Sequence, residues 1–316
     1  CSPDMIEMNQ TEVAGFVFLE FQSLPNINPL LFSIFLVVYT LTLMGNMTII
    51  ALMVLTPSLK SPMYFFLGQL SLYDTMLTTS IAPKMLQVII NGGSTITITG
   101  CISQLYFYGS TSAAECLLLT VMSYDRYLAI CKPLHYNAIM DLRLQVSLVV
   151  WSWFVSSVAM LCITLFIYNL EFCASSFIDH YYCELFPVLN LSCSEHAIFD
   201  LVYFLLTIAF VLFPFLIILF TYISICVTIF GISTTTGKQK SFSTCSSHLI
   251  VVSMYYVTLM TIYMTPSKGQ LININKTLSL LYTTVAPFIN PIIYSLRNQE
   301  IKRAFSVLIS IYLTVN

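Results

Sequence analysis

Long apolar runs that are nearly free of charge alternate with short polar segments along this chain. Each run can supply the roughly 20 residues that a helix needs to cross a bilayer. The pattern therefore predicts an all-α membrane protein, a seven-transmembrane helix bundle. The expected helix ranges are 29–55, 62–88, 98–129, 146–166, 199–231, 241–266 and 277–296.

Basic residues predict the orientation of this bundle, because cytoplasmic loops are enriched in Lys and Arg. An odd number of helices places the two termini on opposite sides, and nine of the 12 basic residues fall on one side. We therefore expect a multi-pass protein of the plasma membrane with an extracellular N-terminus. The nine residues on the inner side are Lys60, Arg126, Lys132, Arg143, Lys238, Lys240, Arg297, Lys302 and Arg303.

This orientation divides the chain into three regions. Residues 1–28 form an extracellular segment, 29–296 the transmembrane domain and 297–316 a cytoplasmic tail. Basic and apolar residues alternate at helical spacing from Arg297 to Ser310. That spacing predicts a short amphipathic helix on the inner surface, in contact with membrane lipid.

Composition narrows the classes of function. Of the 316 residues, 58% are hydrophobic and only 8% are charged, whereas a soluble domain carries about 25% charged residues. A net charge of −2, without a basic stripe, gives no indication of a nucleic-acid partner. The chain has no nucleophile motif, no phosphate-binding glycine loop and no His/Cys cluster, so we expect no enzyme activity, metal centre or organic cofactor.

Two acidic residues, Asp74 and Glu115, lie inside predicted membrane helices. Carboxylates at that depth are costly and are commonly functional. If they face each other, they would hold a cation such as Na⁺ or share a proton. Alternatively, neighbouring polar groups satisfy each carboxylate and the pair only specifies packing. Both interpretations stay open at this level.

The outer halves of the third, fifth, sixth and seventh predicted helices carry uncharged aromatic, aliphatic and hydroxyl side chains. A pocket with this lining suits a small, neutral, mostly apolar ligand with one or two hydrogen-bonding atoms. Each of these side chains serves equally well in helix packing. The candidate ligand residues are Tyr108, Ser112, Thr207, Phe210, Tyr256, Leu259, Tyr263 and Thr283.

The predicted outer side also carries candidate sites of covalent modification. Asn9 begins a glycosylation sequon in the N-terminal segment. An oxidising exterior lets cysteines pair, and four cysteines allow three connectivities. The four outer cysteines are Cys101, Cys173, Cys183 and Cys193.

Four long blocks of sequence resemble a known family. They are 62–67, 123–136, 241–249 and 287–298, and they are joined by Gly45-Asn46 in the first predicted helix. On these blocks the chain resembles a rhodopsin-like G-protein-coupled receptor and, more narrowly, a vertebrate odorant receptor of the class II type. The match covers nearly the whole chain.

The resemblance implies two disulfides, Cys101–Cys183 and Cys173–Cys193. It implies that an odorant binds among the outer residues named above, and that a stimulatory olfactory-type G protein then raises cyclic AMP. Asp74 and Glu115 would form a buried ion or water site. The cytoplasmic switch that meets the G protein would comprise Asp125, Arg126, Tyr127, Tyr222, Asn290, Pro291 and Tyr294.

In one place the chain departs from the family pattern. The Phe-Tyr-Gly of the sixth helix reads Tyr255-Tyr256-Val257 here, which removes a glycine and predicts a stiffer turn.

Other classes fit the sequence less well. A retinal protein needs a lysine in the last helix, and a transporter would show internal repeats and interrupted helices. The alternatives are a rhodopsin-like receptor for another neutral or lipid-like ligand outside the nose and, last, a small-molecule transporter.

Overall fold

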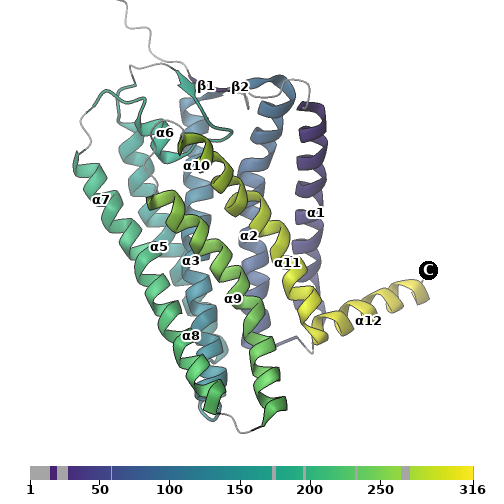
Figure 1. Ribbon diagram of the computed structural model, residues 1–316. Helices are drawn as coiled ribbons and strands as arrows, with labels where there is room; N and C mark the ends of the chain where they lie inside the picture. The colour runs from purple at the N-terminus through teal and green to yellow at the C-terminus, as the bar shows by residue number, and fades with distance from the viewer. Residues whose placement is uncertain are drawn as a thin grey trace, which may run out of the picture.

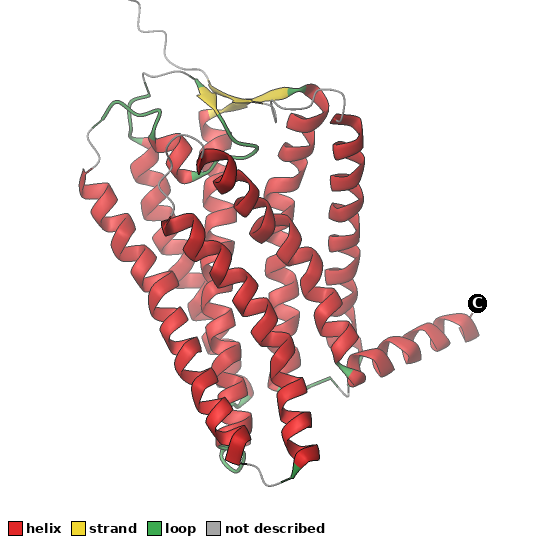
Figure 2. Cartoon of the chain, in the orientation of Figure 1, coloured by secondary structure: helices red, strands yellow, loops and turns green. Residues whose placement is uncertain are grey.

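The computed structural model describes residues 15–19, 28–57, 59–172, 176–194, 197–231, 234–264 and 271–315. Long helices run side by side as a bundle, and a small sheet lies across one end (Figures 1 and 2). The first half of the bundle consists of α1 (Asn28–Leu55), α2 (Pro62–Asn91), α3 (Ile98–Cys131) and α5 (Leu142–Tyr168).

Two helices of the second half contain a π-helical turn. α7 (Ala197–Thr207) continues through Ile208–Leu212 into α8 (Phe213–Gly231), and α10 (Leu271–Leu280) continues through Leu281–Val285 into α11 (Ala286–Arg297). Between them runs α9 (Thr235–Met264). The loops carry two short helices, α4 (Tyr136–Ile139) and α6 (Leu185–Leu189). The long helices begin and end within about six residues of the predicted ranges.

The helix after the last span also forms. This helix, α12, covers Gln299–Val315 and turns away from the foot of α11 (Figure 1). It begins two residues later than predicted, because Asn298 leaves the helical conformation with φ −102° and ψ 112°.

Local sequence explains several helix ends. The Thr97 hydroxyl accepts a hydrogen bond from the Gly100 amide at 3.1 Å, and the Asp141 carboxylate accepts one from the Leu144 amide at 2.8 Å. Side chains of this kind cap helix N-termini by satisfying an orphan amide. α2 ends at Gly92, whose φ of 68° is a left-handed conformation that favours glycine.

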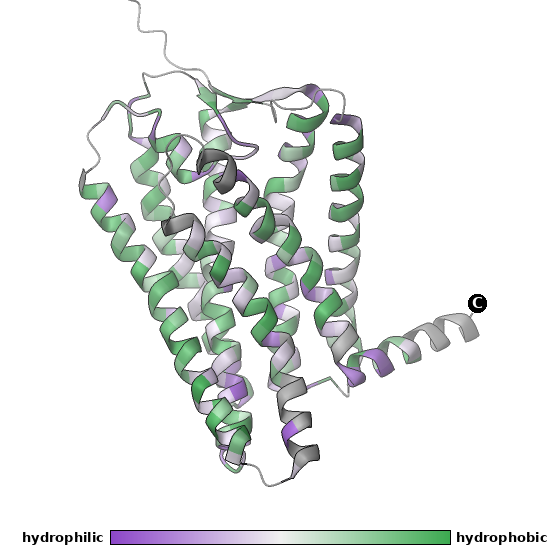
Figure 3. Cartoon of the chain, in the orientation of Figure 1, coloured by the Kyte–Doolittle hydropathy of each residue, from purple (hydrophilic) through white to green (hydrophobic). Residues whose placement is uncertain are grey.

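Three of the described helical segments are long and apolar enough to cross a membrane by length and composition: 28–55, 142–168 and 198–231. They expose large apolar side chains such as Trp151 and Phe220, and α1 and α7–α8 are coloured mostly hydrophobic in Figure 3. α2 and α3 are more polar than these three segments. α3 packs against α2, α5 and α8, so its side chains mostly meet other helices.

A three-stranded sheet, which the sequence pattern did not predict, covers one end of the bundle. Its strand order is β2-β1-β3. β1 (Gly15–Leu19) pairs antiparallel with β2 (Gly93–Thr97) and parallel with β3 (Phe177–Ile178).

Apolar and polar contacts both fasten the sheet to the bundle. Phe16 and Phe18 of β1 are buried among side chains of α2 and α3. The Lys84 ammonium of α2 donates to the Ser94 hydroxyl at 2.9 Å and to the Thr95 carbonyl at 2.7 Å. β1, β2 and β3 therefore form one packed cover over this end of the bundle.

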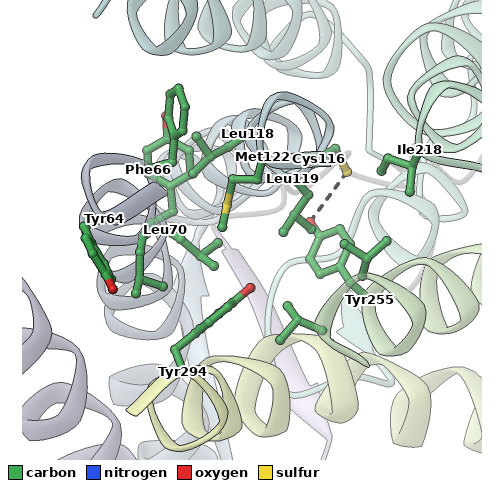
Figure 4. Packing of buried hydrophobic residues seen from close by; sticks show 14 of the residues in the cluster. Tyr64, Phe66, Leu70, Cys116, Leu118, Leu119, Met122, Ile218, Tyr255 and Tyr294 are labelled. Atoms are coloured by element: carbon green, nitrogen blue, oxygen red, sulfur yellow. Dashed lines mark hydrogen bonds between the residues drawn. The ribbon is translucent and has the colours of Figure 1, made fainter. Parts of the chain in front are cut away.

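Buried side chains form two hydrophobic clusters. The inner cluster includes Leu70, Met122 and Tyr294, with the Tyr294 ring pointing between the helices (Figure 4). The outer cluster joins α2, α3 and α5 to the sheet. On α3 the change from outer to inner cluster falls between Tyr108 and Ala114.

Candidate functional site

A cavity of about 110 Å³ lies where the two clusters meet. Its walls come from α3, α5, α7 with its π-helical turn, α9, the second π-helical turn and the loop helix α6. Pockets for drug-sized ligands occupy roughly 300–1,000 Å³, whereas an engineered cavity of about 150 Å³ admits benzene. This cavity therefore suits a small molecule.

Sequence reasoning identified part of the lining. The predicted ligand residues that line the cavity are Tyr108, Ser112, Thr207, Phe210 and Leu259. It missed the contribution of α5, where Ala159, Met160 and Ile163 face the cavity. Small and aliphatic residues in an apolar helix give no signal that separates a cavity wall from a lipid-facing surface.

The remaining three candidates do not contribute to the described lining. The Tyr256 hydroxyl donates to the Cys116 carbonyl at 3.2 Å, and its ring packs on Phe215. The Thr283 hydroxyl donates to the Ser279 carbonyl of its own helix at 2.6 Å. The Tyr263 side chain lies outside the described part of the chain.

The neighbouring Tyr255 reaches the cavity wall instead. Its hydroxyl donates to the Ser112 carbonyl at 2.9 Å and lies 3.0 Å from the Ser112 hydroxyl. It also accepts a contact from the Cys116 thiol at 3.6 Å (Figure 4). Because Ser112 and Cys116 both line the cavity, Tyr255 joins the wall on α3 to α9.

The loop between α5 and α7 is tied down over the cavity. The predicted disulfide between Cys101 of α3 and Cys183 of the loop is confirmed, and the Cys183 amide donates to the Gln104 side chain at 3.0 Å. Cys193 is also disulfide-bonded, while its predicted partner Cys173 lies outside the described residues.

Two contacts join this loop to the last helix. Lys276 forms an ion pair with Asp179, and the Tyr182 and Tyr282 hydroxyls share a hydrogen bond of 2.9 Å. Burial, and then the charge of Glu184, raise the pKa of the Tyr182 phenol well above its usual range, so it remains protonated. The loop therefore contacts both α3 and the α10–α11 helix.

One loop residue brings a charge to the lining. Glu184 lines the cavity, although the sequence predicted a lining without formal charge. Its carboxylate lies 3.0 Å from the His180 imidazole, so the acid faces a basic group within the same loop.

Below the cavity, Asp74 and Glu115 are fully buried and close enough to interact electrostatically. Both Asp74 oxygens accept from the Asn290 amide, at 3.1 and 3.0 Å. One Glu115 oxygen and the Tyr73 and Tyr294 hydroxyls have no hydrogen-bond partner among the described residues. Orphaned buried polar atoms of this kind commonly hold water or an ion. Within the described residues no group of three or more His, Cys, Asp or Glu could hold a metal.

Near the C-terminal end of α3, Arg126 is held by its neighbour. It forms an ion pair with Asp125, and the second Asp125 oxygen accepts from the Tyr136 hydroxyl of α4 at 2.8 Å. Burial, and then the Asp125 charge, raise the pKa of the Tyr136 phenol above its ordinary value, so the donor stays protonated. Tyr127 of the same motif stacks on Tyr124.

Other predicted switch residues join neighbouring helices. The Tyr222 hydroxyl of α8 lies 2.5 Å from the His248 Nδ1 atom of α9. Pro291 of α11 packs directly on Gly45, where an added Cβ would lie 3.2 Å from its ring. Asn9, the predicted glycosylation site, lies outside the described residues.

Comparisons with known proteins identify the family. A family model described as olfactory receptor matches residues 35–311. Human olfactory receptor 5G3 is 44% identical over 301 residues, which cover 95% of this chain and 96% of that protein. Mouse olfactory receptor 5G29 is 46% identical with the same coverage, and human olfactory receptor 10A5 is 43% identical over 94% of each chain. The chain therefore belongs to the olfactory receptor family of G-protein-coupled receptors, which are multi-pass proteins of the plasma membrane and not enzymes.

Proposed function

We propose that seven helical segments of this receptor cross the membrane, with the N-terminal strand β1 outside and α12 inside. The disulfide-tied loop and the sheet lie at one end of the bundle. Arg126 and Lys132 near the C-terminal end of α3 and Lys302 of α12 lie toward the other end (Figure 1). Enrichment of basic residues on cytoplasmic faces favours this end as the inner one.

We infer that the receptor binds a small, neutral, mostly apolar volatile odorant in the cavity below the outer loop. The cavity itself carries this proposal, because it is small, largely apolar and offers few polar atoms. The Thr207 hydroxyl donates to the Tyr203 carbonyl at 2.9 Å, and the Glu184 carboxylate faces His180 at 3.0 Å. We infer that the Ser112–Tyr255 pair offers a hydrogen bond to the odorant.

We propose that an odorant shifts the bundle toward a state in which Arg126 leaves Asp125 and meets a stimulatory olfactory-type G protein, raising cyclic AMP. Helix rise is about 1.5 Å per residue, so Arg126 lies roughly 16 Å along α3 from Glu115. An odorant above Glu115 does not touch Arg126, so the coupling requires a population shift between two packed arrangements.

We also propose that Asp74 and Glu115 hold a Na⁺ ion or ordered water. The orphaned oxygen of Glu115 and the two phenols near it support this site.

A cell assay tests the odorant proposal. The full chain is expressed with a cyclic AMP reporter, and volatile neutral compounds are screened against wild type and Arg126→Ala. We expect Arg126→Ala to reach the surface and to lose the odorant response. A response that survives in Arg126→Ala would contradict the switch. A cavity-filling Ala113→Leu variant that responds to every active odorant as wild type does would contradict the binding site.

A further inference from the structure

A second, larger hollow lies on the membrane-facing side of the bundle. This groove of about 520 Å³ is bounded by α1, α11 and α12, and we call it the α1–α11–α12 groove. It does not share any lining residue with the odorant cavity. Of the residues named for the odorant response, only the predicted switch residue Pro291 lines it.

The groove has the length of one membrane leaflet. On α1 its lining runs from Leu41, near the middle of the helix, to Leu52, close to its inner end. At about 1.5 Å per residue these 11 steps cover roughly 16 Å, and half of a hydrocarbon core of about 30 Å is about 15 Å. The groove therefore spans the inner leaflet from the bilayer midplane to the headgroup region.

The walls of the groove present almost no polar atoms. Its two hydroxyl side chains bond to their own helices: Thr48 donates to the Met44 carbonyl at 2.6 Å and Ser295 to the Ile292 carbonyl at 3.2 Å. Water would find few hydrogen-bond partners along such a wall, whereas a hydrocarbon chain has no hydrogen bonds to lose there. The lining therefore favours an acyl chain.

The inner end of the groove carries one positive charge. Lys302 of α12 belongs to the lining and is exposed, and no carboxylate of the described residues forms an ion pair with it. The nearest acid in sequence, Glu300, accepts instead from the Tyr64 hydroxyl of α2 at 2.7 Å. A cation at the headgroup end of an apolar groove is complementary to a lipid phosphate.

We propose that the α1–α11–α12 groove binds an anionic phospholipid of the inner leaflet, with one acyl chain against α1 and α11 and its phosphate on Lys302. This inference rests on the membrane placement given under the proposed function, with α12 at the inner face. The bound lipid would fill the gap beneath α12 and hold that helix against α1.

Photolabelling of the full-length receptor tests the site. The receptor is placed in phosphatidylcholine nanodiscs that contain a small fraction of phosphatidylserine with a diazirine on its acyl chain, and labelled peptides are mapped after irradiation. We expect labelling of 41–52 that unlabelled phosphatidylserine competes away. Lys302→Ala should reduce it on the order of fivefold, as one basic residue near an anionic surface contributes, and Lys302→Arg should retain it.

Matched variants make the test specific. Arg303→Ala removes the same charge from the next residue of α12, outside the lining, and should change labelling less than twofold. Thr48→Phe should fill the groove and reduce labelling severalfold, whereas Thr40→Phe, an exposed position of α1 outside the lining, should not.

Three results would overturn the proposal. Equal losses in Lys302→Ala and Arg303→Ala would indicate general surface attraction. Equal labelling by a phosphatidylcholine probe would indicate ordinary boundary lipid, and displacement by cholesterol in wild type and Lys302→Ala alike would indicate a sterol site. Staining of an N-terminal epitope on intact cells tests the membrane placement separately, so the two failures are distinguishable.

Discussion

Arg126 is neutralised in this arrangement by the residue directly before it. Asp125 serves two partners, since one oxygen pairs with Arg126 and the other accepts from Tyr136. Hydrogen bonds to charged groups contribute about 1.5–3 kcal/mol. Tyr136 therefore helps to hold the carboxylate that holds Arg126, a role that lies outside the three-residue motif itself.

Replacing Tyr136 by Phe should raise basal cyclic AMP several-fold per receptor at the surface. The change removes one bond that favours the resting arrangement and leaves Arg126 in place. Tyr124→Phe is the matched control, because this exposed tyrosine only stacks on Tyr127. Unchanged basal activity in Tyr136→Phe would show that the bond does not distinguish the two states.

Ser112→Ala should raise the half-maximal odorant concentration by about two- to tenfold, the effect of losing one hydrogen bond. Dose–response curves with the cyclic AMP reporter measure this. Ser103→Ala, on the outward side of α3 and away from the cavity, should leave the curve unchanged. An equal shift of the half-maximal concentration in both variants would mean that the substitutions perturb α3 in general and that Ser112 makes no specific contact with the ligand.

Among the elements, β1 shows which kind of structure a local sequence pattern does not predict. Its alternation is short, and its partners lie 74 to 82 residues away in β2 and 160 residues away in β3, so no local signal marks the pairing. The helices differ from the strand in this respect. Each helix forms its backbone hydrogen bonds within one segment, and its apolar residues are contiguous in the sequence. That is why their ranges follow from the sequence and the sheet does not.

Phe18→Ala should destabilise the outer cover by about 3–5 kcal/mol, because Phe18 is fully buried. The melting temperature of purified receptor and the fraction that reaches the surface measure the loss. Val17→Ala, on the other face of the same strand, should cost less than about 1 kcal/mol. Similar losses in the two variants would mean that the strand contributes only its backbone bonds.

Across the whole molecule, the buried polar centre lies between the odorant cavity and the Arg126 switch. It connects α2, α3 and α11 through Asp74, Glu115 and Asn290. An ion bound there would contact α2, α3 and α11, and if activation shifts these helices relative to one another, its occupancy would favour one arrangement of the bundle.

If Na⁺ binds at this centre, sodium chloride should raise the melting temperature of wild type by a few degrees relative to choline chloride, since a ligand that binds only the folded state stabilises it. Asp74→Asn should abolish the difference, whereas Asp200→Asn, an exposed acid of α7, should retain it. A sodium effect that is equal in all three proteins would leave water as the occupant.

The amino-acid sequence alone predicts the helical class, the ranges of the long helices and the family. These properties depend on composition within one segment or on contiguous motifs.

Tertiary structure alone decided that Tyr255 rather than Tyr256 meets Ser112, that α5 and Glu184 line the cavity, and that Tyr136 holds Asp125. It also decided where the α1–α11–α12 groove lies. The physical reason is that a cavity, a groove or a shared hydrogen bond depends on how each helix is rotated and on which distant segment packs beside it. When a uniformly apolar helix rotates about its axis, the hydrophobicity of the face that it buries changes little. Only the packing of the whole bundle therefore selects the rotation of each helix.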